Sequence, residues 1–188
     1  MYEVSSDDLC TQATADTIGA QLGLVDMTHA GGDPVEDGES WRTDCVIIGL
    51  WRDERFLTEL GPAGPTATVT LEVYADVEAA VRRYESSRDV RQGLVPQSPM
   101  REVDGWWDEG WRIRWYEPLD GASTNHEGLD AVVVLVRGSI RHHNLVIFVG
   151  MRGTVPGPMR EEGYEVLSNL GDLLIEEARQ HVTLSTGA

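Results

Sequence analysis

The sequence predicts an α+β fold in which helices pack on an antiparallel sheet. Three observations lead to this class: strand-length runs of β-branched residues, helical periodicity between and after those runs, and no apolar run of the ~18 residues that span a membrane. The runs follow the order helix, strand, strand, helix, then more strands and a closing helix. This order predicts two pseudo-repeated helix/strand halves within one domain over residues 1–188.

The first half is expected to contain a strand hairpin with helical segments before and after it. The run Ser5–Asp8 is rich in helix-capping residues, and Gly23 can end the helix that follows. In the run Thr66–Tyr74, apolar and polar residues alternate, so one face of a strand should be buried. In chain order, the expected segments are one or two short helices up to Leu22, a loop over 26–44, paired strands Cys45–Trp51 and Thr66–Tyr74, a helix capped by Asp76, and a connector over 86–99.

The second half should repeat this order. Trp111, Ile113 and Trp115 alternate with Arg112 and Arg114, so we assign the three apolar side chains to the core face of one strand. In chain order, the expected segments are a strand over 112–117, a loop over 118–128, strands over 131–136 and 145–151 joined through 138–144, a break over 153–158, and an amphipathic helix over 161–182.

The chain is strongly acidic, with 32 acidic and 15 basic residues and a formal net charge of −17. A negative field of this size repels nucleic-acid phosphates and anionic lipid surfaces, so neither is an expected partner. The simplest role of the charge is solubility, and the alternative is recognition of a basic partner, as in acidic inhibitor and immunity proteins. All 15 basic residues are arginines, which is typical of a high-GC genome and excludes Walker-type phosphate loops, Schiff-base lysines and Ser–Lys pairs.

No group of residues in the sequence indicates catalysis. Neighbouring carboxylates such as Asp108 with Glu109, or Glu161 with Glu162, are expected by chance among 32 acidic residues. Ser139 follows a glycine but lacks the nucleophile-elbow motif, and no His-Glu-x-x-His or glycine-rich phosphate motif occurs. We therefore expect neither catalytic residues nor a cofactor, and the chain should not be an enzyme.

Aromatic and basic side chains provide the first candidate ligand-binding residues. Trp106 and Trp107 flank a turn, where indole rings can stack on sugars or apolar ligands. Arg112 and Arg114 share a strand face on which they could clamp an anion. Salt bridges to the abundant acidic residues are the competing use of these two arginines.

Histidines provide the other candidates. His142 and His143 lie at a predicted hairpin tip, and His126 lies beside Glu127 in a nearby loop, so a metal site of histidine and carboxylate is conceivable. Because adjacent residues of a strand point to opposite faces, His142 and His143 should not share one ion. We expect a solvated turn without a metal site, and keep His142 and His143 as candidate ligand-binding residues.

The two cysteines and the N-terminal sequence bear on location. Cys10 and Cys45 suit either reduced core thiols of a cytoplasmic protein or a disulfide in an oxidising compartment. The first residues lack the basic and apolar regions of a signal peptide, so a signal or anchor of an exported protein is expected outside this chain.

Small motifs along most of the chain are similar to those of a known family. They are Asp8–Cys10, Ile18–Gly23, Arg42–Val46 and Val69–Val77, followed by the final hairpin and helix. With these motifs the chain resembles actinobacterial extracytoplasmic lipoproteins of unknown function and the extracellular sensor domain of a mycobacterial serine/threonine kinase. The resemblance implies a disulfide between Cys10 and Cys45, and anchoring to the outer leaflet through a lipidated cysteine upstream of the domain.

Taken together, these features predict a non-catalytic extracytoplasmic domain, of lipoprotein or sensor type, on the surface of a high-GC Gram-positive bacterium. It would bind a ligand or protein partner of the cell envelope, and would contact the membrane only through an anchor absent from this chain. The main alternative is an acidic cytoplasmic inhibitor or immunity-type protein that binds a basic enzyme, and an envelope hydrolase is a third reading.

Overall fold

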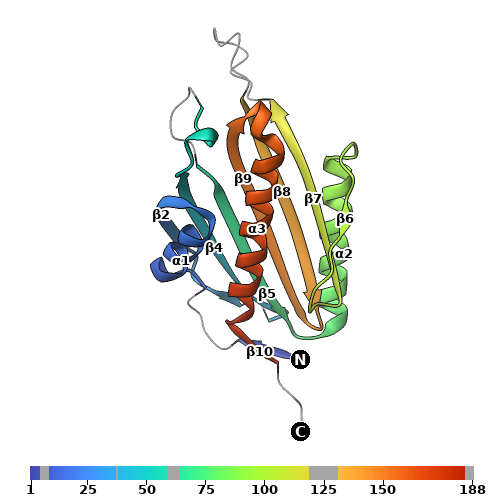
Figure 1. Ribbon diagram of the computed structural model, residues 1–188. Helices are drawn as coiled ribbons and strands as arrows, with labels where there is room; N and C mark the ends of the chain where they lie inside the picture. Colours follow the sequence, from blue (N-terminus) through green and yellow to red (C-terminus); the bar gives the residue numbers. More distant parts are fainter. Residues whose placement is uncertain (5–8, 37, 59–63, 119–130, 185–188) are drawn as a thin grey trace.

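An antiparallel sheet of eight strands is the frame of the molecule (Figure 1). The structure is a computed structural model that describes residues 1–4, 9–36, 38–58, 64–118 and 131–184. The strand order is β2-β4-β5-β9-β8-β7-β6, with β3 paired to β4, and β1 and β10 form a separate two-stranded pair. The strands are β1 (Tyr2–Val4), β2 (Leu24–Gly31), β3 (Val35–Glu36), β4 (Ser40–Trp51), β5 (Thr66–Tyr74), β6 (Arg101–Glu102), β7 (Glu109–Pro118), β8 (Ala131–His142), β9 (Leu145–Pro156) and β10 (Val182–Leu184).

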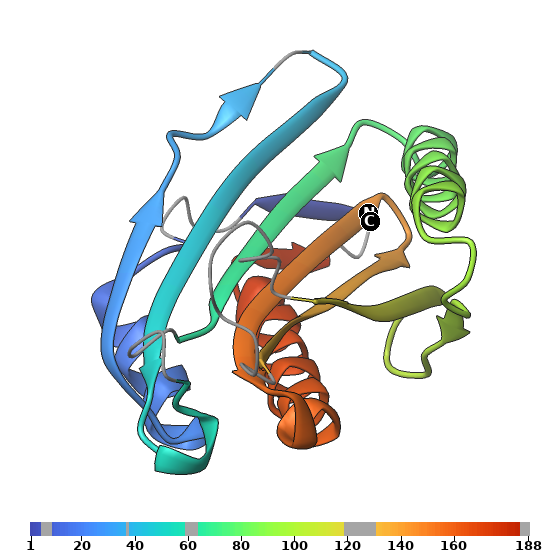
Figure 2. The same cartoon turned by 90° about the horizontal axis from the view of Figure 1, so that it is seen from above.

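The helices lie on both faces of the sheet, which confirms the predicted fold class. They are α1 (Gln12–Leu22), α2 (Val77–Leu94) and α3 (Arg160–Arg179), with short 3-10 turns η1 (Glu54–Phe56) and η2 (Gly157–Met159). Seen from above, α1 and α3 lie on one side of the sheet and α2 on the other (Figure 2). Each half thus supplies a three-stranded meander followed by a helix, and the two following helices, α2 and α3, occupy opposite faces.

Alternation along the strands decides which face each side chain joins. In β5, Val69, Leu71 and Val73 belong to the core under α1 and α3. Thr70 and Glu72 point to the α2 face, where Glu72 meets a guanidinium of α2. The sheet is therefore apolar toward α3 and largely polar toward α2.

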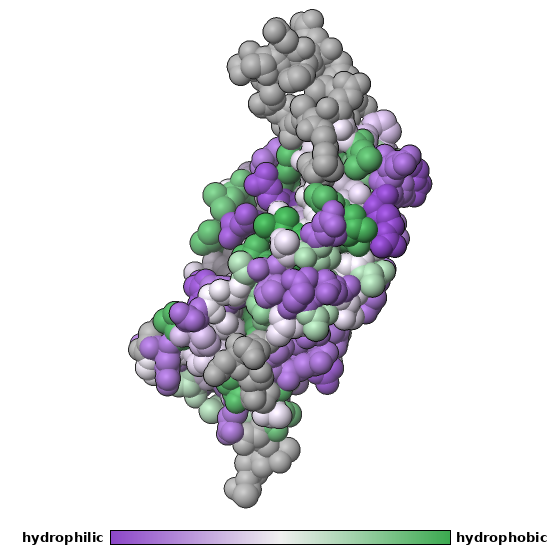
Figure 3. Space-filling view, turned by 90° about the vertical axis from the view of Figure 1, so that its left-hand side faces the viewer, coloured by the Kyte–Doolittle hydropathy of each residue, from purple (hydrophilic) through white to green (hydrophobic). Residues whose placement is uncertain are grey.

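The main core lies between α3 and the sheet. Leu167, Leu170 and Leu174 of α3 are almost completely buried against strand residues such as Leu71 and Ile147. Burial of each leucine contributes about 2 kcal/mol to folding. On the side that carries α1 and β2, hydrophobic residues lie interspersed with hydrophilic ones on the surface (Figure 3).

A smaller apolar cluster attaches α2 to the other face. It joins Tyr84 and Val95 to Trp111 and Ile113 of β7, with Trp115 packed partly against it. The predicted shared face of Trp111, Ile113 and Trp115 is therefore confirmed, but this face belongs to the α2 cluster and not to the main core. None of the described helices has the length and apolar character needed to cross a bilayer.

The predicted helix signals are confirmed in part. Gly23 ends α1 in a left-handed conformation (φ 67°), and Asp76 caps α2 by accepting a hydrogen bond from the Ala79 N–H at 2.7 Å. The residue that caps α1 is Thr11, and the predicted capping run 5–8 lies outside the described residues. The connector predicted over 86–99 is wrong, because α2 continues to Leu94 through polar residues on its solvated side. The first proline after the start of α2 is Pro96, beyond the end of the helix.

Three other loop predictions are wrong. The loop predicted over 26–44 contains β2, β3 and the start of β4; β2 is an edge strand whose side chains are largely exposed, so it lacks an apolar signature. The connection predicted over 138–144 is strand up to His142, and Gly138 fits there because a Cβ would lie 2.9 Å from the Trp111 carbonyl oxygen. The break predicted over 153–158 is strand up to Pro156, where Trp51 Nε1 donates a hydrogen bond to the Thr154 carbonyl. The loop predicted over 118–128 lies, after Pro118, outside the described residues.

Candidate ligand-binding cleft

A cleft separates α2 from the open part of the sheet. Its volume is about 430 Å³, within the range of about 300–1,000 Å³ that small-molecule sites occupy. Helix α2 forms one wall, and β4, β5, β8 and β9 form the floor. The described lining residues are Arg42, Thr66, Thr68, Thr70, Arg83, Ser86, Ser87, Val90, Arg91, Trp111, Leu135, Arg137, Gly138, Phe148, Val149, Gly150, Met151 and Arg152.

Five arginines line this cleft, and no carboxylate is among its described lining residues. Two of the five are neutralised from outside the cleft. Arg83 binds the buried Glu72 carboxylate through two hydrogen bonds of 2.9 and 3.1 Å. Arg42 lies 3.2 Å from Asp44 and 3.9 Å from Glu72. These two cations are therefore compensated within the fold.

The other three arginines, Arg91, Arg137 and Arg152, have no carboxylate partner among the described residues. Ten of the 15 arginines of the chain do form such ion pairs. Of the five that do not, only Arg52 and Arg101 lie outside this cleft. Because the chain holds 32 acidic residues, three uncompensated guanidinium groups in one cleft indicate a site for an anion.

Arg91 and Arg137 influence each other. Burial, and after it the positive charge of Arg137, lower the pKa of the Arg91 guanidinium. Arg137 also lies over the Trp115 ring, with its guanidinium carbon 5.7 Å from the ring centroid. The fold thus holds two like charges near each other in a half-buried position, which an anion between them would relieve.

Two buried hydrogen-bond donors lack partners beside these arginines. The Trp111 indole N–H and the Ser139 hydroxyl bond to none of the described residues, although both side chains are almost completely buried. Trp111 lines the cleft, and Ser139 lies directly opposite it in the β7–β8 register. Ser139 is also two residues from Arg137 on the same strand face. Buried donors without partners are uncommon, so these positions suit a ligand or bound water.

The rest of the cleft is apolar or weakly polar. Phe148 forms part of the floor, and the Arg83 guanidinium lies 4.9 Å above its ring centroid. Leu135 of β8 and Val90 of α2 also line the cleft, and Val90 is 56% exposed. The cleft therefore combines a cationic, donor-rich part with an apolar surface that can hold carbon atoms.

The aromatic and histidine candidates from the sequence gather elsewhere, near the β8–β9 turn. The Trp106 ring centroid lies 5.7 Å from that of Trp107 and 5.6 Å from that of His142. Their N–H groups are engaged within the fold: the Trp106 indole donates to Glu176 at 2.7 Å, and the Trp107 indole donates to the Val103 carbonyl at 2.8 Å. These contacts join elements of the fold to one another, and a ligand role for Trp106, Trp107 and His142 stays a prediction.

The two histidines do not point to opposite faces, so that prediction is wrong. Their rings stack with centroids 4.4 Å apart, because His143 has left the strand for a turn with φ 53°. His142 shares a hydrogen bond of 2.9 Å with the Tyr2 hydroxyl, and its Nε2 lies 3.6 Å from Asp108. The described residues contain no cluster suited to a metal ion, and His126 and Glu127 lie outside them.

Arg112 and Arg114 lie on the α3 face and do not reach the cleft. Arg112 forms an ion pair with Asp172 of α3, and Arg114 lies 3.5 Å from Glu161. They thus form the salt bridges that competed with the anion clamp. The sequence patterns did not predict a role for Arg91, Arg137 or Arg152. The one available signal was Arg137, which interrupts a long β-branched run.

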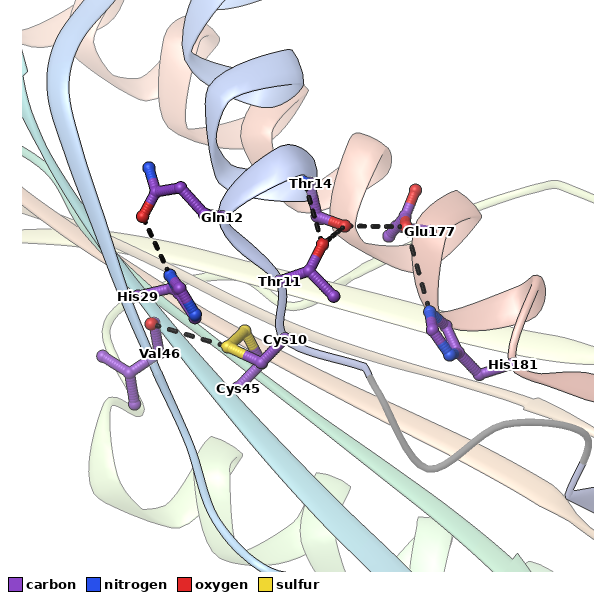
Figure 4. The surroundings of a disulfide bond; sticks show 9 residues. All are labelled: Cys10, Thr11, Gln12, Thr14, His29, Cys45, Val46, Glu177 and His181. Atoms are coloured by element: carbon purple, nitrogen blue, oxygen red, sulfur yellow. Dashed lines mark hydrogen bonds and ion pairs between the residues drawn. A yellow bond between two sulfur atoms is a disulfide. The ribbon is translucent and has the colours of Figure 1, made fainter.

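A disulfide joins Cys10, just before α1, to Cys45 in β4, with a Cα–Cα distance of 5.2 Å (Figure 4). It is the pair that the family resemblance implied. Nearby, the Thr14 hydroxyl donates to Glu177 of α3 at 3.1 Å, so α1 is tied both to the sheet and to α3. The disulfide therefore fixes the start of α1 on the α3 face of the sheet, away from the cleft.

No protein-family model and no curated protein sequence matches this chain. Among solved structures, the chain is similar to the extracellular domain of PknH from Mycobacterium tuberculosis, with 8% identity and a TM-score of 0.44 over 95% of this chain and 98% of that one. The similarity is weak even at the level of the fold.

Proposed function

We propose that this chain is a non-catalytic, extracytoplasmic binding domain that holds an anionic ligand in the cleft between α2 and the sheet. The observation that carries the proposal is the set of three arginines without carboxylate partners, Arg91, Arg137 and Arg152, on the walls of one cleft. In a chain with a net charge of −17, such a cleft attracts anions that the rest of the surface repels. The lipoprotein or sensor type belongs to the same proposal.

The chemistry of the cleft favours binding over reaction. Its described lining residues include no aspartate, glutamate, histidine or cysteine. General base catalysis needs a side chain that can take up a proton, and a serine or threonine nucleophile needs such a base beside it. An arginine stays protonated at neutral pH. The side chains that line the cleft can therefore hold and orient an anion, but they offer no base to start a reaction.

The location outside the cytoplasm is supported by the disulfide. Disulfides persist in oxidising compartments and are rare in the reducing cytosol. Intact-mass measurement after alkylation, with and without reductant, tests this part on protein made in an oxidising compartment. Cys10 and Cys45 should resist alkylation until reduced. Free alkylation of both thiols in unfolded, unreduced protein would contradict the location and favour the acidic cytoplasmic inhibitor.

Native mass spectrometry tests the binding role without assuming the ligand's chemistry. The protein is incubated with a small-molecule extract of bacterial cell envelopes and freed of unbound material. Thr68 is an exposed residue that lines the cleft, and Thr28 is an exposed threonine of β2 outside it. We expect a ligand adduct on the wild type and on Thr28→Trp, and none on Thr68→Trp. An adduct that Thr68→Trp retains in full, or no adduct on the wild type, would contradict the proposal.

A further inference from the structure

We infer that the ligand of this cleft is an organic phosphate monoester, whose phosphate binds among Arg91, Arg137 and Trp111 while its organic part lies on Phe148. This inference rests on the proposed function and adds the chemical class of the ligand. It follows from three features of the cleft: its uncompensated charge, the guanidinium and indole donors on its walls, and its apolar floor.

The charge of the cleft suits a dianion. Arg91, Arg137 and Arg152 contribute three positive charges that no described carboxylate balances. A carboxylate ligand supplies one negative charge and would leave most of this charge uncompensated. A phosphate monoester carries about −1.5 to −2 at pH 7, so it neutralises the pair Arg91 and Arg137 and still lies in the field of Arg152.

The donors of the cleft suit a group that only accepts hydrogen bonds. A guanidinium has five N–H donors and no acceptor, and an indole has one donor and no acceptor. The Trp111 indole N–H lacks a partner in the described part of the chain, and so does the hydroxyl of the adjacent Ser139. The oxygens of a phosphate monoester accept several such bonds, and guanidinium groups bind phosphate in a two-pronged geometry. A neutral sugar could bond to the serine and threonine hydroxyls of the cleft, but it would leave the charge of the three arginines uncompensated.

The floor of the cleft suits an organic substituent. Phe148, Leu135 and Val90 line the same cleft as the arginines. The Arg83 guanidinium already covers one face of the Phe148 ring, so the organic part would contact the rest of this ring together with Leu135 and Val90. Inorganic phosphate would occupy only the cationic part and make no contact with these apolar side chains. A volume of about 430 Å³ holds a phosphate together with a ring or short chain, so contact with Phe148 adds to the affinity.

Phenyl phosphate is the probe that tests this class, by isothermal titration calorimetry on the full chain at low and at physiological ionic strength. Benzoate supplies a carboxylate on the same ring, phenol supplies the ring alone, and inorganic phosphate supplies the anion alone. We expect phenyl phosphate to bind most tightly and benzoate about tenfold or more less tightly, because it forms fewer charge-assisted hydrogen bonds. The affinity for phenyl phosphate should fall as salt is added.

Two charge-matched double variants locate the binding. Arg91→Gln with Arg137→Gln removes the cleft pair. Arg52→Gln with Arg101→Gln removes the two arginines outside the cleft that also have no carboxylate partner in the described part of the chain. The first should weaken phenyl phosphate binding about tenfold or more, and the second less than about twofold. Circular dichroism confirms that both variants are folded before titration.

The outcomes separate this inference from the proposed function. Equal affinity for benzoate and phenyl phosphate would overturn the phosphate class and leave an anion-binding cleft. Equal losses in the two double variants would show attraction by general charge and overturn the site. A Thr68-sensitive adduct in native mass spectrometry, without any binding of phenyl phosphate, would overturn the inference alone. Absence of that adduct would overturn the proposed function itself.

Discussion

Arg91 of α2 and Arg137 of β8 line the same cleft with no described carboxylate to neutralise either, although ten other arginines of this acidic chain form ion pairs. Burial and the charge of Arg137 both lower the pKa of Arg91, so holding the two cations together destabilises the fold. Such a local cost is typical of binding sites, where function and stability oppose each other.

Neutralising Arg91 should stabilise the protein. Arg91→Gln removes a half-buried cation that lies near a like charge, so the free energy of unfolding should rise by about 0.5 kcal/mol at low salt. Urea unfolding at two salt concentrations measures this change, and the gain should shrink as salt screens the repulsion. Arg101→Gln, at an exposed arginine outside the cleft, serves as the control. A loss of stability in Arg91→Gln would show that Arg91 has a structural partner.

Glu72 should have opposite effects on stability and on ligand affinity. Its buried carboxylate accepts hydrogen bonds from Arg83 and from the Tyr74 hydroxyl, the latter at 2.7 Å. Glu72→Gln should lower the free energy of unfolding by about 1–2 kcal/mol, a value reduced because Arg83 is partly exposed. It should also tighten phenyl phosphate binding, because Glu72 then no longer neutralises the positive charges of Arg83 and Arg42.

Denaturant unfolding and calorimetry on the same variant check both effects of Glu72→Gln. Glu78→Gln is the matched control. Glu78 lies on α2 with its side chain 91% exposed, and its ion pair with Arg82 is long, at 3.9 Å. It should change stability by less than about 0.5 kcal/mol. Weaker phenyl phosphate binding by Glu72→Gln, with the fold intact, would contradict the electrostatic account of the cleft.

The disulfide should contribute strongly to stability. Cys10 and Cys45 are separated by 35 residues, and closing a loop of this length contributes about 3–4 kcal/mol in the chain-entropy description. The double variant Cys10→Ala, Cys45→Ala should lose about this much in urea unfolding, while phenyl phosphate binding in the distant cleft persists. A reductant should then affect only the wild type. Equal stability of wild type and double variant would contradict this role.

Protonation of His142 should destabilise the fold. Burial lowers its pKa from 6.5, and His143, Arg141 and Arg179 lower it further, against the opposing effect of Asp108. Since the unfolded state then binds the proton first, the His142 contribution is complete above about pH 6.5 and is lost as the pH falls through the folded pKa. Unfolding free energies between about pH 7 and pH 5 measure this loss.

Two variants isolate the contribution of His142 to this pH dependence. His142→Gln should flatten the dependence between about pH 7 and pH 5, because no imidazole remains to take up the proton. His29→Gln, at an exposed histidine of β2, should keep the wild-type slope. If His142→Gln keeps the full slope, another group is responsible.

Elements with a local signature were predicted from the sequence. The bounds 66–74 of β5 and its pairing with β4 follow from alternation and a neighbouring β-branched run, and Asp76 marks the start of α2. Strand β2 was not predicted, because it is an edge strand with exposed side chains and its sequence resembles a loop. A local sequence pattern thus predicts the strands and helices that bury one face.

The cleft was not predicted, for a different reason. Arg112 and Arg137 look alike in the sequence, since each lies in a strand among apolar residues. In the fold, Arg112 meets Asp172 of α3, while Arg137 points to the other face. Whether an arginine finds a carboxylate depends on which helix covers its side of the sheet. That property is tertiary, and local periodicity does not contain it.

The most direct test of the cleft is two-dimensional ¹⁵N NMR of the tryptophan indole and arginine Nε–H groups during titration with phenyl phosphate. Among the six indole signals, the three that the test needs can be assigned with Trp106→Phe, Trp107→Phe and Trp111→Phe variants, and the arginine signals with Arg91→Gln and Arg137→Gln. The account predicts that the Trp111 indole shifts together with Arg91 and Arg137. Shifts of Trp106 and Trp107 instead, with Trp111 and both arginines unchanged, would contradict it and place binding at the β8–β9 turn.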